Sequence, residues 1–361
     1  MYFFAEGMRG GTVTRLCVFT VVGARPQFVK AAAMSRALAA AEGISEILIH
    51  TGQHFDPGMS QIFFEELGLT PPRVNLHIHG GGHGEMTGRM LAALERLIIE
   101  EQPDLVLVSG DTTSTLAGAL AAAKLHVPVA HLEAGLRSYN RRMPEEINRV
   151  LTDHISTLLL CPTATAVGNL RMEGIVRGVH DIGDVMYDAT LFAAAGARSS
   201  PVLDRLGIAG RCFALATVHR AESTEDCETL GEIIAFLRER ARDCVVVLPI
   251  HPRLRQRIEE WNLDLRGILT CDPVGYLDMH RLLQSAIAVF TDSGGLQKEA
   301  YFHQVPCVTL RNETEWVETV EAGWNRLWKE PNYAPRREIS AFGDGRAAAK
   351  AVALIVDYLR C

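Results

Sequence analysis

Three carboxylates of this chain lie at predicted element boundaries between residues 110 and 149. Asp111 and Glu133 each follow closely on an apolar run with the composition of a buried strand, and Glu145 opens a helical stretch. In an open parallel α/β sheet, ligands bind in the crevice outside the carboxyl ends of the strands. Carboxylates gathered there could carry protons to and from a substrate.

A plainer interpretation exists for each carboxylate taken alone. Asp111 could cap the helix that follows it, and Glu145 could simply occupy the first turn of its helix, where negative charge is favoured. Three such carboxylates together favour proton-transfer chemistry.

The first predicted strand is followed by a turn that could hold an anion. Residues 16–22 form a continuous apolar run that ends at Gly23, and a helical stretch covers residues 28–40. Helix N-terminal amides, with Arg25 and Lys30 nearby, could bind a phosphate group. A single glycine is a weak signal, so alone it indicates only an α/β opening turn.

A stronger anion signal follows the predicted strand at 286–290. Ser293, Gly294 and Gly295 open a helix whose backbone amides could hold a diphosphate. Glu299 lies about one turn further along the same face, from where it could accept both hydroxyls of a ribose. The alternative is an ordinary capped helix with a solvent-facing glutamate.

Two groups of histidines could in principle bind a metal ion. His50 and His54 lie in one turn, but no third ligand is evident, so substrate contact or turn structure is favoured. Loop 77–89 has three consecutive glycines flanked by histidines. We interpret it as a loop over an active site, in preference to a nickel or zinc site.

Strands and helices alternate along the chain, which predicts an α/β fold of doubly wound, Rossmann-like domains. At 361 residues, two domains are expected. We place the N-terminal domain at 1–190, the C-terminal domain at 191–345, and a helix that packs back on the N-terminal domain at 346–361. The last strand is predicted at 305–310, and residues 179–186 are predicted to form the crossover between domains.

Composition excludes several classes of protein. A formal net charge of −7 argues against a general nucleic-acid or anionic-membrane surface. No apolar run approaches the ~20 residues of a membrane span, and the apolar part of residues 1–8 is too short for a signal peptide. The eight cysteines are scattered without a CxxC pair, as expected for reduced thiols of a cytoplasmic protein.

The motifs, taken together, resemble those of the non-hydrolysing UDP-N-acetylglucosamine 2-epimerases. That family has a GT-B architecture, with two Rossmann-like domains and the active site in the cleft between them. The matches cover nearly the whole chain: GARPQFVK (23–30), TGQH (51–54), GDTTSTLAGALAA (110–122), HLEAGLRS (131–138), PEEINRVLTD (144–153), HRAE (219–222), HP (251–252), DPVGYL (272–277) and TDSGGLQKEA (291–300).

The resemblance implies roles for individual residues. The family's acid/base carboxylates match Asp111, Glu133 and Glu145. The family's histidine beside the diphosphate matches His219. The expected UDP and sugar contacts are Arg25, Lys30, Gln53, His54, Arg137, Arg142, His251, Ser293, Gly294, Gly295 and Glu299. Gln53 and His251 also lie where a second, regulatory UDP-sugar site would be sought.

The implied reaction uses neither metal nor nicotinamide. A carboxylate removes the C2 proton, UDP leaves by anti elimination to give a 2-acetamidoglycal, and UDP adds back after C2 is reprotonated on the other face. The resemblance also implies a homodimer with a UDP-sugar as its only small-molecule partner.

Three departures from the plain UDP-N-acetylglucosamine enzymes indicate a particular branch. Segment 134–144 is two residues shorter than usual, segment 79–91 differs, and Trp316 stands where an arginine is usual. These features are similar to the branch that epimerises UDP-2,3-diacetamido-2,3-dideoxy-glucuronate for bacterial surface polysaccharide. Arg141 and Arg142 would place two cations beside Glu145, and Arg142 could grip the C6 carboxylate of that substrate.

Other functions stay open on the sequence alone. The same chemistry could act on UDP-N-acetylglucosamine, or a hydrolysing variant could release UDP and free sugar. A GT-B glycosyltransferase would require an acceptor and would leave three N-terminal carboxylates without a role. A UDP-sugar sensor would not need those carboxylates together.

Overall fold

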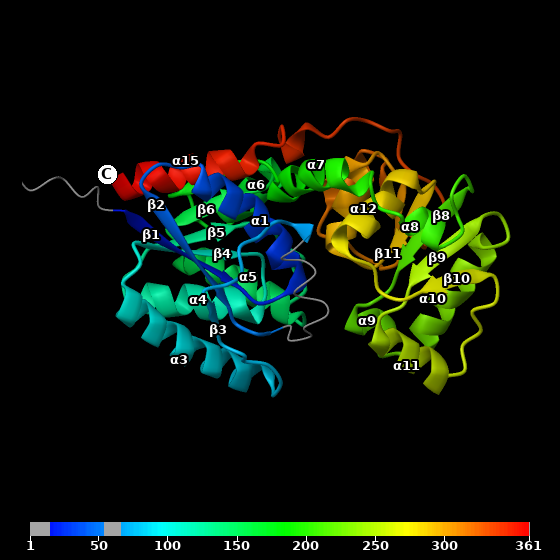
Figure 1. The fold of residues 1–361 in the computed structure, drawn as a ribbon, viewed down its shortest axis with the longest axis horizontal. Coiled ribbons are helices and arrows are strands. Elements are labelled where there is room, and N and C mark those ends of the chain that lie inside the picture. The colour runs from blue at the N-terminus through cyan, green and yellow to red at the C-terminus, as the bar shows by residue number, and fades with distance from the viewer. Residues whose placement is uncertain (1–14, 54–65, 361) are drawn as a thin grey trace, which may run out of the picture.

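The computed structural model describes residues 15–53 and 66–360. Two parallel sheets with helices on both faces form two lobes that lie side by side (Figure 1). The N-terminal sheet has strand order β3-β2-β1-β4-β5-β6-β7 among the described residues. Its strands are β1 (Leu16–Val22), β2 (Ile44–His50), β3 (Val74–Asn75), β4 (Leu105–Ser109), β5 (Val129–Leu132), β6 (Leu158–Cys161) and β7 (Val179–Asp181).

The C-terminal sheet repeats this parallel arrangement. Its strand order in the described chain is β10-β9-β8-β11-β12-β13. The strands are β8 (Phe213–Thr217), β9 (Val245–Pro249), β10 (Ile268–Cys271), β11 (Ala288–Thr291), β12 (Cys307–Thr309) and β13 (Asn325–Leu327). The predicted α/β fold with two doubly wound sheets is therefore confirmed.

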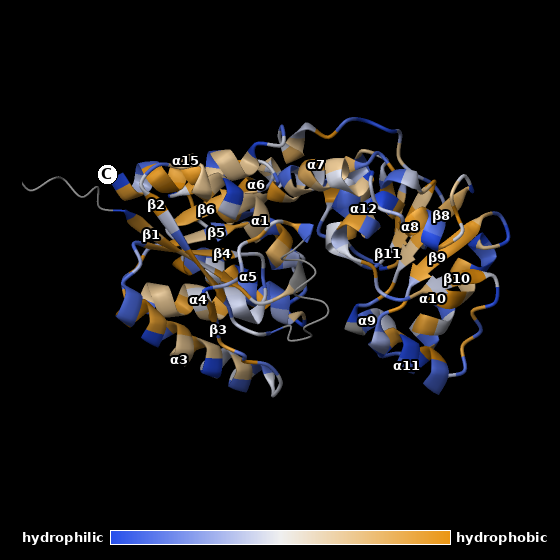
Figure 2. Ribbon diagram, in the orientation of Figure 1, coloured by the Kyte–Doolittle hydropathy of each residue, from blue (hydrophilic) through white to orange (hydrophobic). Residues whose placement is uncertain are grey.

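Apolar runs form the central strands because helices cover both faces of each sheet. All five residues of β4 are buried, as are all four of β5 and of β6. Such strands lack polar alternation, since neither face meets water. Figure 2 shows these apolar strands at the centre of each lobe and polar residues on the outer faces of the helices.

The helices fall into two groups around the sheets. Those of the N-terminal lobe are α1 (Arg25–Ala39), α3 (His83–Glu101), α4 (Thr113–Lys124), α5 (Pro144–Ile155) and α6 (Ala164–Met172). Those of the C-terminal lobe are α8 (Val202–Arg205), α9 (Ala221–Thr224), α10 (Cys227–Arg240), α11 (Pro252–Glu260), α12 (Tyr276–Ser285), α13 (Gly294–Phe302) and α14 (Val317–Glu321), with a short 3-10 turn at Ser340–Phe342.

Helix α7 (Val185–Ala197) connects the lobes. It packs against α1 on one side and against α12 and α13 on the other. The final helix, α15 (Ala347–Arg360), returns to the N-terminal lobe and packs on α1 and α7 (Figure 1). The carboxylate of Asp188 in α7 accepts hydrogen bonds from the first two backbone amides of α15, at 3.1 and 2.9 Å, which fixes where that helix begins.

Two predictions about the elements are wrong. The strand predicted at 305–310 is not the last, because β13 pairs in parallel with β12. β13 is only three residues long and contains Arg326, so it lacks the apolar run that marks the other strands. Residues 179–186 are not only a crossover, since β7 adds a short edge strand there before α7 begins.

Helix starts also differ from the prediction. α1 begins at Arg25, three residues earlier than expected, because Pro26 suits a first turn where its missing amide hydrogen costs nothing. α3 begins at His83, so the end of the glycine-rich segment is helical. No helix in the described ranges is long and apolar enough to cross a membrane.

Candidate active site

Asp111 and Glu133 follow two neighbouring strands at the same edge of the N-terminal sheet. β4 pairs with β5 so that Ser109 lies opposite Leu132. Gly110, with φ of 68°, turns the chain out of β4, and Glu133 has a φ of 71°. Few non-glycine residues adopt this left-handed conformation, which commonly marks functional positions.

The side chain of Glu133 is held between two lysines. Its Oε2 is paired with Nζ of Lys30 from α1, and its Oε1 lies 2.9 Å from Nζ of Lys298 from α13. Lys298 also lies 2.5 Å from Oδ2 of Asp184. Burial alone would raise the pKa of Glu133, but Lys298 and Lys30 lower it to about 2. We call these four residues the inter-domain charge cluster.

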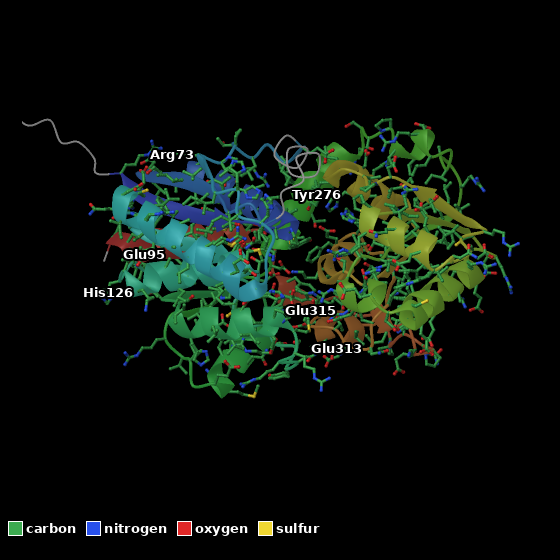
Figure 3. The ribbon with its side chains drawn as sticks, turned by 90° about the horizontal axis from the view of Figure 1, so that it is seen from below. Arg73, Glu95, His126, Tyr276, Glu313 and Glu315 are labelled. Carbon is green, nitrogen blue, oxygen red and sulfur yellow. The ribbon has the colours of Figure 1, made fainter. Side chains whose placement is uncertain are left out.

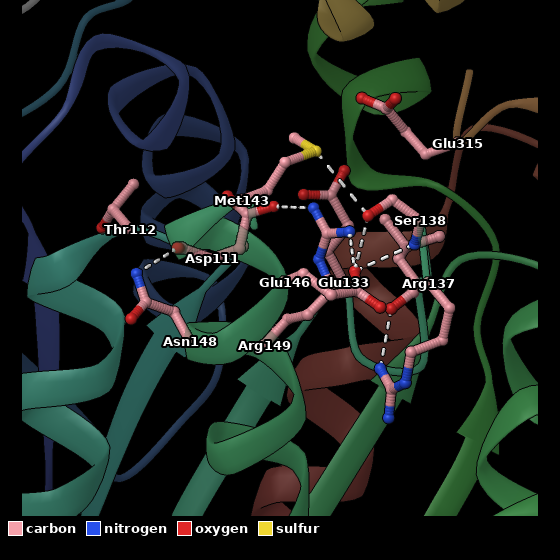
Figure 4. Close-up of polar contacts among 12 residues, drawn as sticks. Asp111, Thr112, Glu133, Arg137, Ser138, Met143, Glu146, Asn148, Arg149 and Glu315 are labelled. Atoms are coloured by element: carbon pink, nitrogen blue, oxygen red, sulfur yellow. Dashed lines mark hydrogen bonds and ion pairs between the residues drawn. The ribbon is translucent and has the colours of Figure 1, made fainter. Parts of the chain in front are cut away.

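Asp111 forms an ion pair with Arg149 of α5 (Figure 4). Arg149 also contacts the carboxylate of Glu146 at 2.7 Å, so it bridges two acidic groups. Asp111 does not cap α4. The N-cap is Thr112, whose hydroxyl accepts a hydrogen bond from the backbone of Thr115 at 3.2 Å. The capping interpretation of Asp111 is therefore wrong, and its carboxylate is left at the end of β4 beside a cation.

The adjacent glutamates of α5 have different environments. Glu146 is buried, and its carboxylate accepts hydrogen bonds of 2.9 Å from the backbone and hydroxyl of Ser138 and from the backbone of Tyr139. Burial raises the pKa of Glu146, but these hydrogen bonds and Arg149 lower it below its usual value. Glu145 occupies the exposed side of the first turn and is therefore accessible to a ligand.

Arg137, predicted to contact substrate, lies in a buried ion-pair network. Its guanidinium contacts Asp153 at 2.6 Å and Glu173 at 2.7 Å. Asp153 also lies 2.7 Å from Nδ1 of His131, whose Nε2 lies 2.7 Å from the carbonyl oxygen of Gly110. These contacts tie Arg137 to the turn that carries Asp111, which makes it a structural support in this conformation.

The start of α13 has the geometry expected of an anion site. Ser293 is the N-cap, and its hydroxyl accepts a hydrogen bond from the backbone of Leu296 at 3.4 Å. A Cβ atom at Gly294 would meet the carboxylate of Glu315, so a larger residue here would displace that side chain. Glu299 is 7% exposed. The alternative of a solvent-facing glutamate at this position is therefore wrong.

Two arginines surround Glu315 beside this helix start. Arg311 lies 2.9 Å and Arg220 3.4 Å from its carboxylate. Nε and Nη2 of Arg311 are buried and have no hydrogen-bond acceptor among the described residues. Buried guanidinium donors are normally satisfied. Figure 3 shows Glu315 between the two lobes, close to Glu313.

The other predicted residues fall into two sets, those that the structure describes and those that lie outside the described ranges. Nδ1 of His219 is 3.2 Å from the buried carboxylate of Asp292, and its side chain is 50% exposed. Gln53 binds the hydroxyl of Ser114 at 2.7 Å, and His251 precedes α11 as its N-cap. Arg142 is exposed. His54 and the side chain of Arg25 lie outside the described residues.

Four charged residues of this region were not predicted from the sequence. Arg149, Asp184, Lys298 and Glu315 each make two or more ion pairs or capping contacts there. Arg149 and Lys298 lie inside motifs that were noted, but their partners are far away in sequence. For Lys298, the one signal in the sequence was a lysine on a largely apolar helix face, which indicates a buried charge.

Comparison with known proteins agrees with this geometry. The family model described as UDP-N-acetylglucosamine 2-epimerase matches residues 36–354. The chain is 55% identical over 315 residues to the UDP-2,3-diacetamido-2,3-dideoxy-D-glucuronate 2-epimerase of Pseudomonas aeruginosa, covering 86% of this chain and 87% of that protein. It is 48% identical to a UDP-N-acetylglucosamine 2-epimerase homolog of Methanococcus maripaludis, over 95% of this chain and 99% of that one.

The solved structures include a similar fold. The crystal structure of Methanocaldococcus jannaschii UDP-GlcNAc 2-epimerase in complex with UDP-GlcNAc and UDP superposes with a TM-score of 0.85 at 40% identity, covering 95% of this chain and 99% of that one. The chain therefore belongs to the UDP-N-acetylglucosamine 2-epimerase family, the non-hydrolysing UDP-sugar 2-epimerases of GT-B-like fold.

The inter-domain charge cluster predicts how stability depends on pH. The pKa of Glu133 falls from an ordinary 4.5 to about 2 in the folded chain. A carboxyl group with a lowered folded pKa stabilises the fold above its unfolded pKa, and this stabilisation is lost as pH falls through the folded value. Between pH 4.5 and 2 the free energy of unfolding should therefore drop.

Urea unfolding at several pH values tests this prediction. The Glu133→Gln variant should be less stable than wild type at pH 7 and should lose less stability between pH 4.5 and 2. Glu95→Gln is the control, because Glu95 is exposed on α3 and lies far from the inter-domain region (Figure 3). Equal losses in wild type and Glu133→Gln would contradict the assigned pairing.

Proposed function

We propose that this chain interconverts UDP-2,3-diacetamido-2,3-dideoxy-glucuronate and its manno epimer at C2. The observation that supports this best is the placement of the carboxylates. Asp111 and Glu133 follow the ends of neighbouring strands, and Glu133 is joined through Lys298 to α13 of the other lobe, while Glu145 is exposed in the first turn of α5. The 55% identity to the Pseudomonas aeruginosa enzyme supports the choice of sugar.

The diphosphate would bind at the start of α13. Backbone amides at a helix N-terminus carry partial positive charge and point at a bound anion. The two unpaired donors of Arg311 would add charge-assisted hydrogen bonds as UDP leaves. Glu299, one turn further in, remains the proposed ribose contact, and His219 the proposed diphosphate-side histidine.

Different carboxylates would carry out the two proton transfers at C2. As the bond from C1 to the diphosphate oxygen breaks, positive charge develops at C1 and the C2 proton becomes acidic. Glu133, which two lysines keep ionised, can then stabilise that charge or accept the proton. Loss of the proton and of UDP gives the glycal. A proton delivered to the other face of C2, followed by attack of the diphosphate oxygen on C1, gives the epimer.

Glu145 is suited to the second proton. It is exposed in the first turn of α5, unlike the buried Glu146 beside it. Asp111, paired with Arg149, would be the third participant. The face of C2 that a carboxylate serves is set by its position. The direction of the reaction decides only which group acts as base and which as acid, because these roles are exchanged when the reaction reverses.

Contacts between the lobes would keep water from the reactive glycal. The carboxylate of Glu66 accepts a hydrogen bond from the backbone of Leu277 at 3.1 Å, and Asn140 donates to Glu313 at 3.4 Å. With the bond from Lys298 to Glu133, these join the lobes at separate places. A closed cleft limits hydrolysis of intermediates.

The substrate's C6 carboxylate would be bound by Arg142. This residue and Arg141 are exposed directly before α5, whose first turn carries Glu145. Arginine matches the geometry of a carboxylate with two parallel hydrogen bonds. A neutral sugar would gain nothing from this contact.

UDP-N-acetylglucosamine is the second candidate substrate, giving UDP-N-acetylmannosamine. The similarity to the Methanocaldococcus jannaschii structure, which contains UDP-GlcNAc and UDP, favours it. The proposal further places the protein in the cytoplasm as a homodimer that supplies a sugar precursor for bacterial surface polysaccharide. Gln53 and His251 remain proposed contacts of a second UDP-sugar.

Proton NMR in D₂O tests the function directly. Purified protein is incubated with each UDP-sugar in turn, and the anomeric and C2 signals are followed. The expected result is a manno-type anomeric signal with deuterium at C2 for the diacetamido uronate. Turnover of UDP-N-acetylglucosamine alone would overturn the proposed substrate, and inactivity with both would overturn the proposed function.

The role of Arg142 has its own comparison. Arg142→Met should lower kcat/KM for the uronate by roughly 10- to 100-fold, the value of a charged hydrogen bond of about 1.5–3 kcal/mol, and should leave a neutral analogue nearly unchanged. Arg141→Met is the matched control on the neighbouring exposed arginine. Equal losses on the acidic and neutral sugars would rule out a carboxylate contact.

A further inference from the structure

Lys298 connects the two lobes at the proposed reaction centre. It lies on α13, the proposed nucleotide-binding helix, and its side chain is 1% exposed. Its ammonium contacts Glu133 at the end of β5 at 2.9 Å and Asp184 at 2.5 Å. Asp184 is the N-cap of α7, the helix between the lobes, and caps it by accepting from Met186 at 2.8 Å. One ammonium group therefore joins three elements.

Trp316 covers the remaining side of this ammonium. The centroid of its ring lies 3.8 Å from Nζ of Lys298, and the tryptophan is 3% exposed. A buried cation is costly unless charged or π-electron partners replace its water. Burial lowers the pKa of Lys298, but Asp184 and Glu133 outweigh this and raise it above its usual value. An arginine at position 316 would instead place a second cation against the ammonium.

We propose that Lys298 is a positioning residue for epimerisation, which fixes the carboxylate of Glu133 relative to α13, and that Trp316 holds the lysine in that position. The proposal rests on the proposed function, because it assumes that Glu133 acts on the sugar while α13 holds the diphosphate. In this proposal Lys298 acts on Glu133 and is assigned no contact with C1 or C2 of the sugar. It acts by setting the distance between the two groups that do the chemistry.

Loss of Lys298 would change the titration of Glu133 in a defined direction. Glu133 faces Lys30 from α1, Lys298 from α13 and, through Lys298, Asp184 at the start of α7. Without Lys298, one lysine remains near two carboxylates, so the pKa of Glu133 rises. Glu133 would then be ionised only at higher pH, and the acid limb of the kcat profile would move upward.

The main test compares Lys298→Met with Lys329→Met in the full chain. Lys329 is the matched control: its Nζ also faces a tryptophan ring, Trp328, at 5.2 Å, but its side chain is 62% exposed. For the UDP-sugar that the wild-type enzyme epimerises, Lys298→Met should lower kcat by about 100-fold, the usual scale of acid–base catalysis. KM should change little, and the acid limb should rise by roughly one pH unit or more.

A conservative variant separates positioning from folding. Lys298→Arg keeps the charge, so it should recover the wild-type acid limb and most of kcat. Lys329→Met should match wild type throughout. A Lys298→Met enzyme whose kcat and acid limb both stay at wild-type values would overturn the proposal.

If Lys298→Met does not fold, variants at position 316 test whether Lys298 positions Glu133. Trp316→Ala should shift the acid limb upward as Lys298→Met does, because the ammonium loses the ring that holds it beside Glu133. Trp316→Phe, which keeps an aromatic face, should shift it less. The Glu133 carboxyl can also be titrated directly by carbon-13 NMR of labelled glutamate, assigned with Glu133→Gln. This readout needs no turnover, so an inactive wild type would contradict the proposed function while the titration still tests Lys298. An unchanged titration in Trp316→Ala would overturn the proposal.

Discussion

The structure depends on a buried group of charges that neither lobe contains alone. Lys30, Glu133 and Asp184 come from the N-terminal lobe and the start of α7, and Lys298 comes from the C-terminal lobe. Two cations and two anions balance each other, which is the condition for burying them. Removal of any one would leave an unpaired buried charge. If the lobes separate, Glu133 loses its pair with Lys298, which costs free energy. The relative position of the lobes and the ionisation of Glu133 therefore depend on each other.

The three carboxylates of this region have separate environments, and only Glu133 belongs to the cluster. Glu133 is held ionised by lysines, Asp111 is paired with Arg149, and Glu145 stands exposed at a helix start. A reaction that moves protons on two faces of one carbon needs acid/base groups that reach it from both sides. The lobes supply complementary charge, because the three carboxylates lie in the N-terminal lobe and the start of α13 with Arg311 lies in the C-terminal lobe.

Much of this fold could be predicted from local sequence, because the buried strands are apolar runs and the turns that follow carry glycine or carboxylate. The prediction failed at β13, whose three residues lack that pattern. The alternative that Asp111 caps α4 was also wrong, because Thr112 one residue later is the cap. The partners of Lys298 and Arg137 could not be predicted. Their ion pairs join residues far apart in sequence, and only the packed sheets bring them together.

The most direct measurement is a crystal structure of the Glu145→Gln variant with UDP-2,3-diacetamido-2,3-dideoxy-glucuronate. The predicted complex has the diphosphate within hydrogen-bond distance, about 3 Å, of the amides at Ser293 and Gly294. It has C2 of the sugar between Glu133 and position 145, with the reacting atoms roughly 3–3.5 Å apart. A sugar bound with C2 remote from all three carboxylates, or a diphosphate bound away from α13, would contradict the account.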